Sequence, residues 1–222
     1  MIFAGGIAKT HAAFLLAAMT VCSPQATPTV QMTFTNNAPV EINDKSSAEL
    51  GSFHISTTFS HTRNEIFTVG GLMESNFAPE YRILFMTETD PVSGLACISP
   101  SQISIAVNYA PRIYIASEVA RGTCRYTVNM QHEVRHVNTD IITFNEFLPQ
   151  IGTAVQDAVN KIRPMGPTDA GGLTIAQNRI TDIVQEALVR KTEEIEKIRL
   201  SRQQMIDTRA EYLRASALCQ GQ

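Results

Sequence analysis

The sequence contains no tryptophan, no block of lysine and arginine residues, no long-period repeat and no apolar run that would span a bilayer comfortably. Its 222 residues carry a formal net charge of −3, so nothing in it indicates a nucleic-acid partner. With 44% hydrophobic and 18% charged residues, the composition is that of an ordinary soluble protein with one domain, or one domain plus an appendage.

The N-terminus has the pattern of an export signal. Lys9 precedes an apolar run at residues 12–21, and small and turn-forming residues follow through Ala26. A run of this length suits the apolar core of a signal peptide. We therefore expect a signal peptide at residues 1–26 and a single domain at 27–222, exported to the periplasm or secreted, with no stable transmembrane helix after signal removal.

The chain has few cysteines, and their spacing does not suit metal binding. Cys22 can be read as a lipid attachment site, but Val21 before it fits that pattern poorly. Export would place the others in an oxidising compartment, where disulfides form. We favour a Cys97–Cys124 bridge, which would join the end of a strand region to the start of a helix. A bridge between Cys124 and Cys219 remains open.

Hydrophobic periodicity divides the domain into three parts. Residues 27–118 contain short runs rich in β-branched and aromatic residues, separated by turn signals, and read as strands. Residues 122–163 have a helical period, with Pro149 ending or kinking the helix. A break at 164–172 precedes one long helix over 173–218. The expected fold is α+β: a small, mostly antiparallel sheet, then a helix, then a long antiparallel C-terminal helix.

The first helical region contains the pentapeptide His132-Glu133-Val134-Arg135-His136, which fits the HExxH pattern. Residues four apart lie on one face of a helix, so the two imidazoles can hold one zinc ion between them. Glu133 points to the side and can act as the general base toward a water that the metal activates. The alternative is a helix with two polar histidines on a solvent-exposed face.

The longer stretch, residues 132–140, resembles the H-E-x-x-H-x-x-T-D motif of thermolysin-type gluzincin peptidases. The chain as a whole is similar to small exported bacterial zincin-like proteins of uncharacterised function. The resemblance implies a zincin-like fold, a zinc cofactor and a peptide or protein substrate, with Glu133 as the catalytic base. In this family a glutamate on a following helix is the third metal ligand, within an N-E-x-x-S-D motif. That motif has no counterpart at the expected distance here.

A third metal ligand therefore has to come from elsewhere. If the two helical regions pack antiparallel about the break at 164–172, the region near residues 200–204 faces the two histidines. Asp207 is the first choice for the ligand, Glu211 the second and Glu146 the third. Asp140, one turn beyond His136, is too far along the helix to reach the metal, so we expect it to orient an imidazole.

Two classes of function follow. The first is an exported zinc metallopeptidase, in which Tyr212, Arg209 or His54 would stabilise the oxyanion. The second is a non-catalytic envelope or secreted protein that docks an envelope partner through its long C-terminal helix, whose middle at 190–202 carries charges of both signs. A combination, in which the zincin-like fold keeps its metal for structure alone, also remains open.

Overall fold

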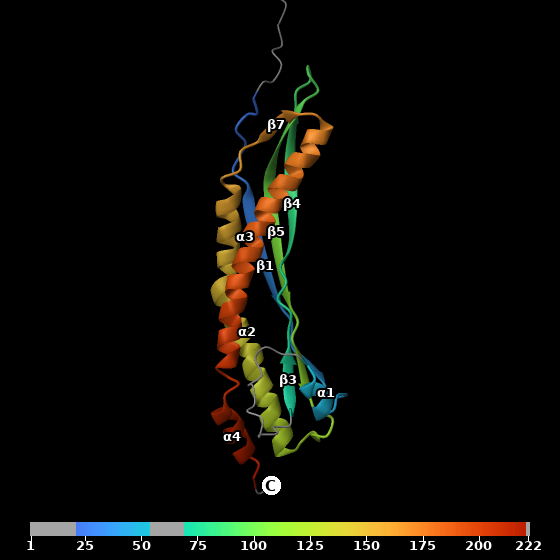
Figure 1. Cartoon of the computed structure of the whole chain (residues 1–222), viewed down its shortest axis with the longest axis vertical. Coiled ribbons are helices and arrows are strands. Elements are labelled where there is room, and N and C mark those ends of the chain that lie inside the picture. Colours follow the sequence, from blue (N-terminus) through green and yellow to red (C-terminus); the bar gives the residue numbers. More distant parts are fainter. Residues whose placement is uncertain (1–20, 54–68, 221–222) are drawn as a thin grey trace, which may run out of the picture.

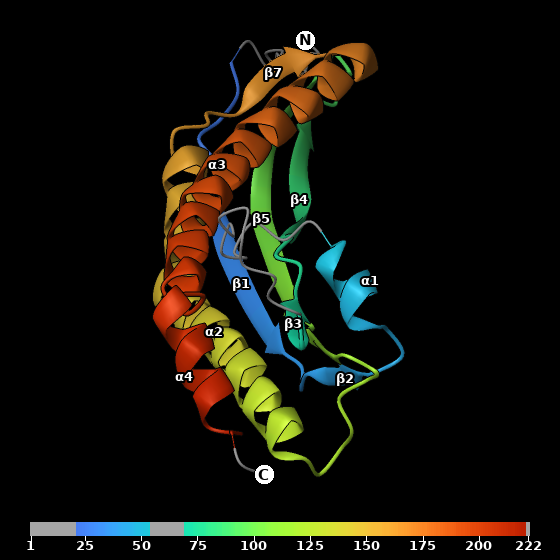
Figure 2. The ribbon, with the colours of Figure 1, turned by 60° about the horizontal axis from the view of Figure 1, so that its bottom comes forward.

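The protein has an α+β architecture. A computed structural model describes residues 21–53 and 69–220. The long strands and helices run along the long axis of the molecule. Helices α2 and α3 lie side by side against the strands (Figures 1 and 2). The elements in chain order are β1 (Thr29–Asn36), β2 (Val40–Ile42), α1 (Ser47–Gly51), β3 (Gly71–Glu74), β4 (Glu80–Thr89), β5 (Ala96–Tyr109), β6 (Arg112–Ile115), α2 (Cys124–Val159), β7 (Met165–Thr168), α3 (Ala170–Gln204) and α4 (Arg209–Ala217).

The strands form two mixed sheets and not the one mostly antiparallel sheet that was expected: β3, β4 and β7 pair antiparallel, whereas β1 and β2 pair parallel. In the larger sheet β5 lies between β1, which is parallel to it, and β4, which is antiparallel, and β7 also pairs with β5. In the smaller sheet β6 lies between the parallel β2 and the antiparallel β3. Three stretches of chain each contribute one strand to each sheet. The last stretch is central in both sheets, with the first stretch parallel to it on one side and the middle stretch antiparallel to it on the other.

Helix α2 covers the larger sheet with an apolar stripe. The ring of Phe144 is fully buried and packs against Phe34, Phe77 and Tyr109. Pro149 lies inside α2 without ending it, because residues on both sides of it are buried against the sheet and hold the helix in place. The buried residues of α2 beyond Phe144 are Leu148, Ile151, Val155 and Val159.

The long C-terminal helix expected at 173–218 is interrupted. Helix α3 ends at Gln204 and α4 begins at Arg209, where the side chain of Thr208 caps the new helix by accepting from the backbone N–H of Glu211. The four residues of the break contain Asp207, which is only 7% exposed. Asp207 lies four residues after the buried Gln203 and so on the same face, and the break places its carboxylate next to the motif of α2.

The disulfides differ from the favoured pairing. Cys22 is bonded to Cys97, and Cys124 to Cys219. The expected Cys97–Cys124 bridge is wrong because the 14 residues of β5 carry the chain roughly 45 Å from Cys97 toward the other end of the molecule before α2 begins. The Cys124–Cys219 bridge, which the sequence left open, is present.

The Cys22–Cys97 bridge bears on the expected export signal. Residues 1–20 of that signal lie outside the described part of the chain. Cleavage after Ala26 would remove Cys22, and lipid attachment would use the same sulfur, so neither is compatible with this bridge in one mature molecule. Within residues 21–53 and 69–220, none of the helices has the length and apolar character needed to cross a membrane.

Candidate metal centre

The N-terminal half of α2 places the HExxH residues on the inner side of the helix. Thr123 caps the helix by accepting from the backbone N–H of Tyr126, and the motif follows about two turns later. His132, Glu133 and His136 are 8%, 5% and 5% exposed. The alternative of two histidines on a solvent-exposed face is therefore wrong.

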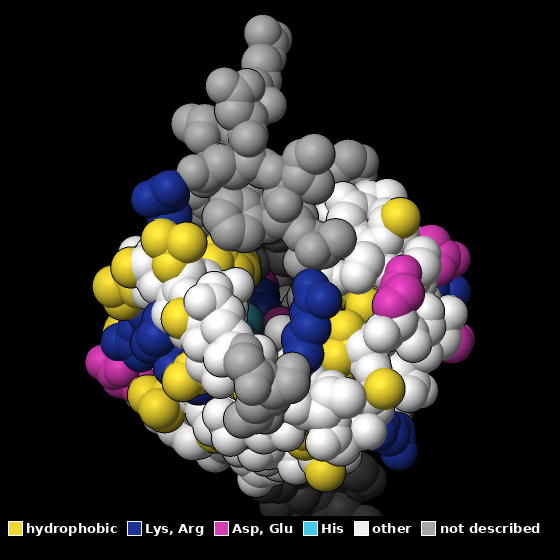
Figure 3. All heavy atoms as spheres, turned by 90° about the horizontal axis from the view of Figure 1, so that it is seen from below, with side chains coloured by type: hydrophobic (Ala, Val, Ile, Leu, Met, Phe, Trp, Pro, Cys, Tyr) yellow, Lys and Arg dark blue, Asp and Glu magenta, His cyan; other side chains and the backbone are white. Residues whose placement is uncertain are grey.

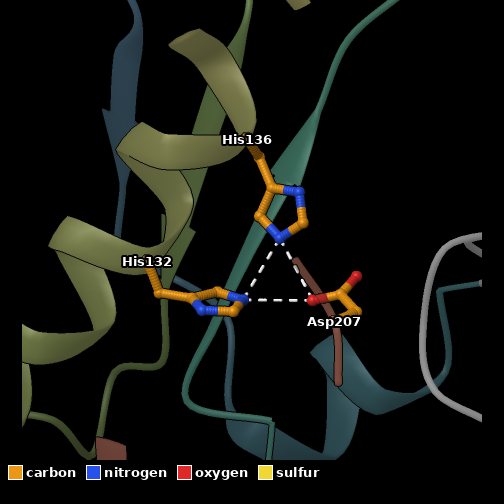
Figure 4. A group of neighbouring side chains, drawn as sticks. All are labelled: His132, His136 and Asp207. Atoms are coloured by element: carbon orange, nitrogen blue, oxygen red, sulfur yellow. Dashed lines mark hydrogen bonds and ion pairs between the residues drawn. The ribbon is translucent and has the colours of Figure 1, made fainter. Parts of the chain in front are cut away.

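Three side chains converge at one point, two from α2 and one from the break between α3 and α4 (Figure 4). Nε2 of His132, Nε2 of His136 and Oδ1 of Asp207 are each 3.1 Å from the other two. Adjacent ligand atoms around a tetrahedral zinc ion, with bonds near 2.0–2.1 Å, lie about 3.3 Å apart. Two imidazole nitrogens and one carboxylate oxygen are also a donor set that zinc prefers. The buried cluster can hold a metal ion in both spacing and chemistry.

His136 is oriented by Gln203, the penultimate residue of α3. The amide oxygen of Gln203 accepts from Nδ1 of His136, and its NH₂ group donates to the carbonyl of His136 and to Asp140. Since both partners of the NH₂ group are acceptors, the amide can only present its oxygen to the imidazole. Nδ1 of His136 therefore carries the proton, and its Nε2 directs a lone pair into the cluster.

Asp140 lies behind Gln203 at the centre of a buried polar network. Its carboxylate accepts from the hydroxyls of Ser75 and Tyr109 at 2.9 and 3.0 Å. Arg199 of α3 forms a bidentate ion pair with it at 2.7 and 2.9 Å. We expected Asp140 to contact an imidazole directly. Instead it accepts a hydrogen bond from the Gln203 amide, and that amide contacts His136. The Asp140 carboxylate points toward α3, where Arg199 and Gln203 bind it, and Gln203 contacts the His136 ring in its place.

Asp207 is held by hydrogen bonds from several donors. Tyr212 donates its hydroxyl to Oδ1 at 3.0 Å, and its ring packs against the ring of His132. Burial works to raise the pKa of Asp207, but its contacts with the His132 and His136 imidazoles outweigh burial and hold that pKa well below its usual range. Burial and the nearby Asp207 raise the pKa of Tyr212, so its hydroxyl stays protonated. The carboxylate is thus present as an anion.

The other two proposed ligands lie elsewhere. Glu211 forms ion pairs with Arg135 and Arg214, and its Oε1 is 3.8 Å from Nδ1 of His132, the ring nitrogen that faces away from the cluster. Glu146 is half exposed and pairs with Arg202. Neither carboxylate meets the two Nε2 atoms, because Glu211 lies one turn beyond the break and Glu146 lies on α2 itself, three turns past the motif.

Glu133 lies beside the edge strand β3. A side chain added at Gly71 would come within 2.8 Å of its Oε1, so the strand can approach this closely only because residue 71 is glycine. Burial raises the pKa of Glu133 to about 7, while the two histidines and the backbone N–H of Met73 act in the opposite direction. A carboxyl with a pKa near neutrality is suited to accept and return protons.

This pKa predicts a pH dependence of stability in the metal-free protein. Between the ordinary value of 4.5 and about 7, the folded state keeps a proton on Glu133 that the unfolded state releases. The free energy of unfolding should therefore fall as the pH rises through this window, by up to about 3 kcal/mol. Urea unfolding in a chelator, from pH 4.5 to 8, measures it. Glu133→Gln should lack this contribution, and parallel pH profiles for the two proteins would contradict the assignment.

The site lies at the end of the molecule where α4 and the C-terminus are found. Figure 3 shows a hollow there, with histidine and acidic side chains visible inside it and a Lys or Arg side chain at its rim. His54, one of the residues considered for oxyanion stabilisation, falls outside the described residues. Of the other two, Tyr212 reaches the cluster through Asp207.

Comparison with known proteins gives no relative. The chain matches no protein-family model, no curated protein and no solved structure. The geometry of the site is therefore the main indication of function.

Proposed function

We propose that the protein is an exported zinc-dependent metallopeptidase with a zincin-like arrangement. The observation that carries the proposal is the convergence of His132, His136 and Asp207, at 3.1 Å from one another, beside a buried Glu133. The HExxH spacing on α2 and the edge strand beside it are the features shared with zincins. The local resemblance to thermolysin-type peptidases supports the same assignment.

Each residue has a role in peptide hydrolysis. Zinc held by the two imidazoles and Asp207 would acidify a water molecule and polarise the carbonyl oxygen of the substrate. Glu133, buried beside the cluster, would accept the proton of the attacking water and return it to the leaving amine. Tyr212 keeps its hydroxyl proton and would donate it to the oxyanion on turning away from Oδ1 of Asp207.

Two observations support export. The two disulfides use all four cysteines of the chain, and bridges of this kind persist in oxidising compartments. The apolar N-terminal run has the pattern of a signal peptide, which would have to be cleaved before Cys22 for both bridges to form. We infer a periplasmic or secreted protein whose substrate is a peptide or another protein.

Glu133→Gln tests the catalytic role. The substitution keeps the size of the side chain and removes its ability to act as a base. It should leave about one zinc per chain, measured by plasma mass spectrometry, and lower kcat on a peptide library by at least about a thousandfold. Zinc bound in both proteins with no hydrolysis by either would indicate a structural metal site. Zinc bound by neither would contradict the metal centre itself.

A further inference from the structure

The two imidazoles of the cluster are held in opposite tautomers. Nη2 of Arg135 lies 3.1 Å from Nδ1 of His132. A guanidinium has only donors, so Nδ1 of the neutral ring accepts this hydrogen bond and Nε2 carries the proton. His136 has the reverse arrangement, because Gln203 accepts from its Nδ1. His132 therefore directs an N–H group, and His136 a lone pair, toward the centre of the cluster.

Metal binding requires the other tautomer of His132. A nitrogen that carries a proton cannot coordinate a metal, and the proton must find an acceptor at Nδ1. Oε1 of Glu211 is 3.8 Å from this atom. The carboxylate is mostly buried, at 13% side-chain exposure, and Arg214 holds it through two hydrogen bonds of 2.7 and 2.8 Å. Arg135, bound to the same carboxylate, has a side chain that is 43% exposed.

We propose that Glu211 is the positioning residue for His132, and that Arg135 competes with it for the same ring nitrogen. When a divalent metal binds, Arg135 leaves Nδ1 and the ring proton moves from Nε2 to Nδ1, where it is donated to Glu211. One N–H bond breaks and one forms, so the protein gains and loses no proton overall. Arg214 keeps the Glu211 carboxylate in place after Arg135 departs.

This inference rests on the proposed metal site and gives each imidazole a partner from the C-terminal part of the chain. Gln203 of α3 accepts from Nδ1 of His136 and so favours its binding tautomer. Glu211 of α4 fixes His132 only when Arg135 has left. His136 is thus ready to bind a metal, whereas His132 must first change its tautomer. Arg135 therefore lowers the metal affinity, and Glu211 raises it.

Nitrogen-15 NMR of the histidine rings, with and without zinc, observes the exchange directly. Metal-free protein should show His132 with its proton on Nε2, and zinc-loaded protein should show a slowly exchanging Nδ1–H. Glu211→Ala should remove that protection and weaken zinc binding about 10- to 100-fold, as loss of a ligand-orienting partner generally does. Glu211→Gln, which keeps an acceptor oxygen, should restore much of the protection. Arg135→Met should strengthen zinc binding several-fold.

The outcomes separate this inference from the metal site on which it depends. Competition titration with a zinc-binding dye gives the affinities, and Glu146→Ala, which breaks an exposed ion pair away from the cluster, is the control. A wild-type protein that binds no zinc would contradict the metal site. Two results would overturn the role of Glu211 but not the metal site. In one, Glu211→Ala changes the zinc affinity by less than twofold; in the other, Arg135→Met weakens zinc binding as much as Glu211→Ala does.

Discussion

Replacement of Asp207 by alanine is expected to lower the affinity for zinc by about a thousandfold. Apparent binding free energies of zinc in protein sites are about 10–16 kcal/mol, so an equal share for each of three ligands is about 4 kcal/mol. The carboxylate is the ligand that lies in the break between α3 and α4 and completes the triangle with the two Nε2 atoms. Competition titration and zinc content after dialysis measure the loss.

Glu146→Ala is the matched control, since Glu146 is the acidic residue that the sequence offered as another ligand. It pairs with Arg202 at the surface, and its loss should leave the zinc affinity unchanged. Circular dichroism of each variant in a chelator separates loss of metal from loss of structure. If the two alanine variants bound zinc equally well, Asp207 would not be a ligand.

Removal of the Cys124–Cys219 bridge is expected to affect both stability and the metal site. The bridge joins residues 95 apart, and closing a loop of this size is worth up to about 4–5 kcal/mol through the entropy of the unfolded chain. Helix α4 buries no residue of its own, so its position depends on this bridge and on a few polar contacts. Replacing both cysteines by serine should therefore also weaken zinc binding.

The other disulfide gives a control of similar loop size. Cys22 and Cys97 are 75 residues apart and lie at the end of β5 far from the cluster. Replacing this pair by serine should cost a comparable amount in the free energy of unfolding, measured with urea, yet leave the zinc affinity as it was. Equal effects of both double variants on zinc binding would show that the metal site responds to global stability alone.

The local parts of the site could be predicted from the sequence. The spacing of His132 and His136 fixes both rings on one face of a helix, and the glycine-rich break at 164–172 implies an antiparallel return. Counting residues outward from that break brought Asp207 near the histidines. The break after Gln204 could not be predicted, but Asp207 still lies on the same face as the buried Gln203, four residues before it.

The remaining features depend on contacts between distant parts of the chain. Alternating apolar residues predict that β1 and β5 are strands, but they do not say that the two are parallel partners. Likewise, nothing near Cys97 in the sequence identifies Cys22 as its partner. Gln203 was missed because a single glutamine on a mixed-charge helix has no distinguishing pattern. Its burial at 1% exposure becomes apparent only when α3 packs on α2.

The position of the Cys124–Cys219 bridge has a further consequence for how the molecule would respond to a protease. All three converging side chains lie within the 95-residue loop that the bridge closes. The connection between α2 and α3, at residues 160–169, lies inside the same loop. A cut in that connection would place the two histidines and Asp207 on separate polypeptides. Those polypeptides would stay covalently joined, so the metal donors would remain parts of one particle.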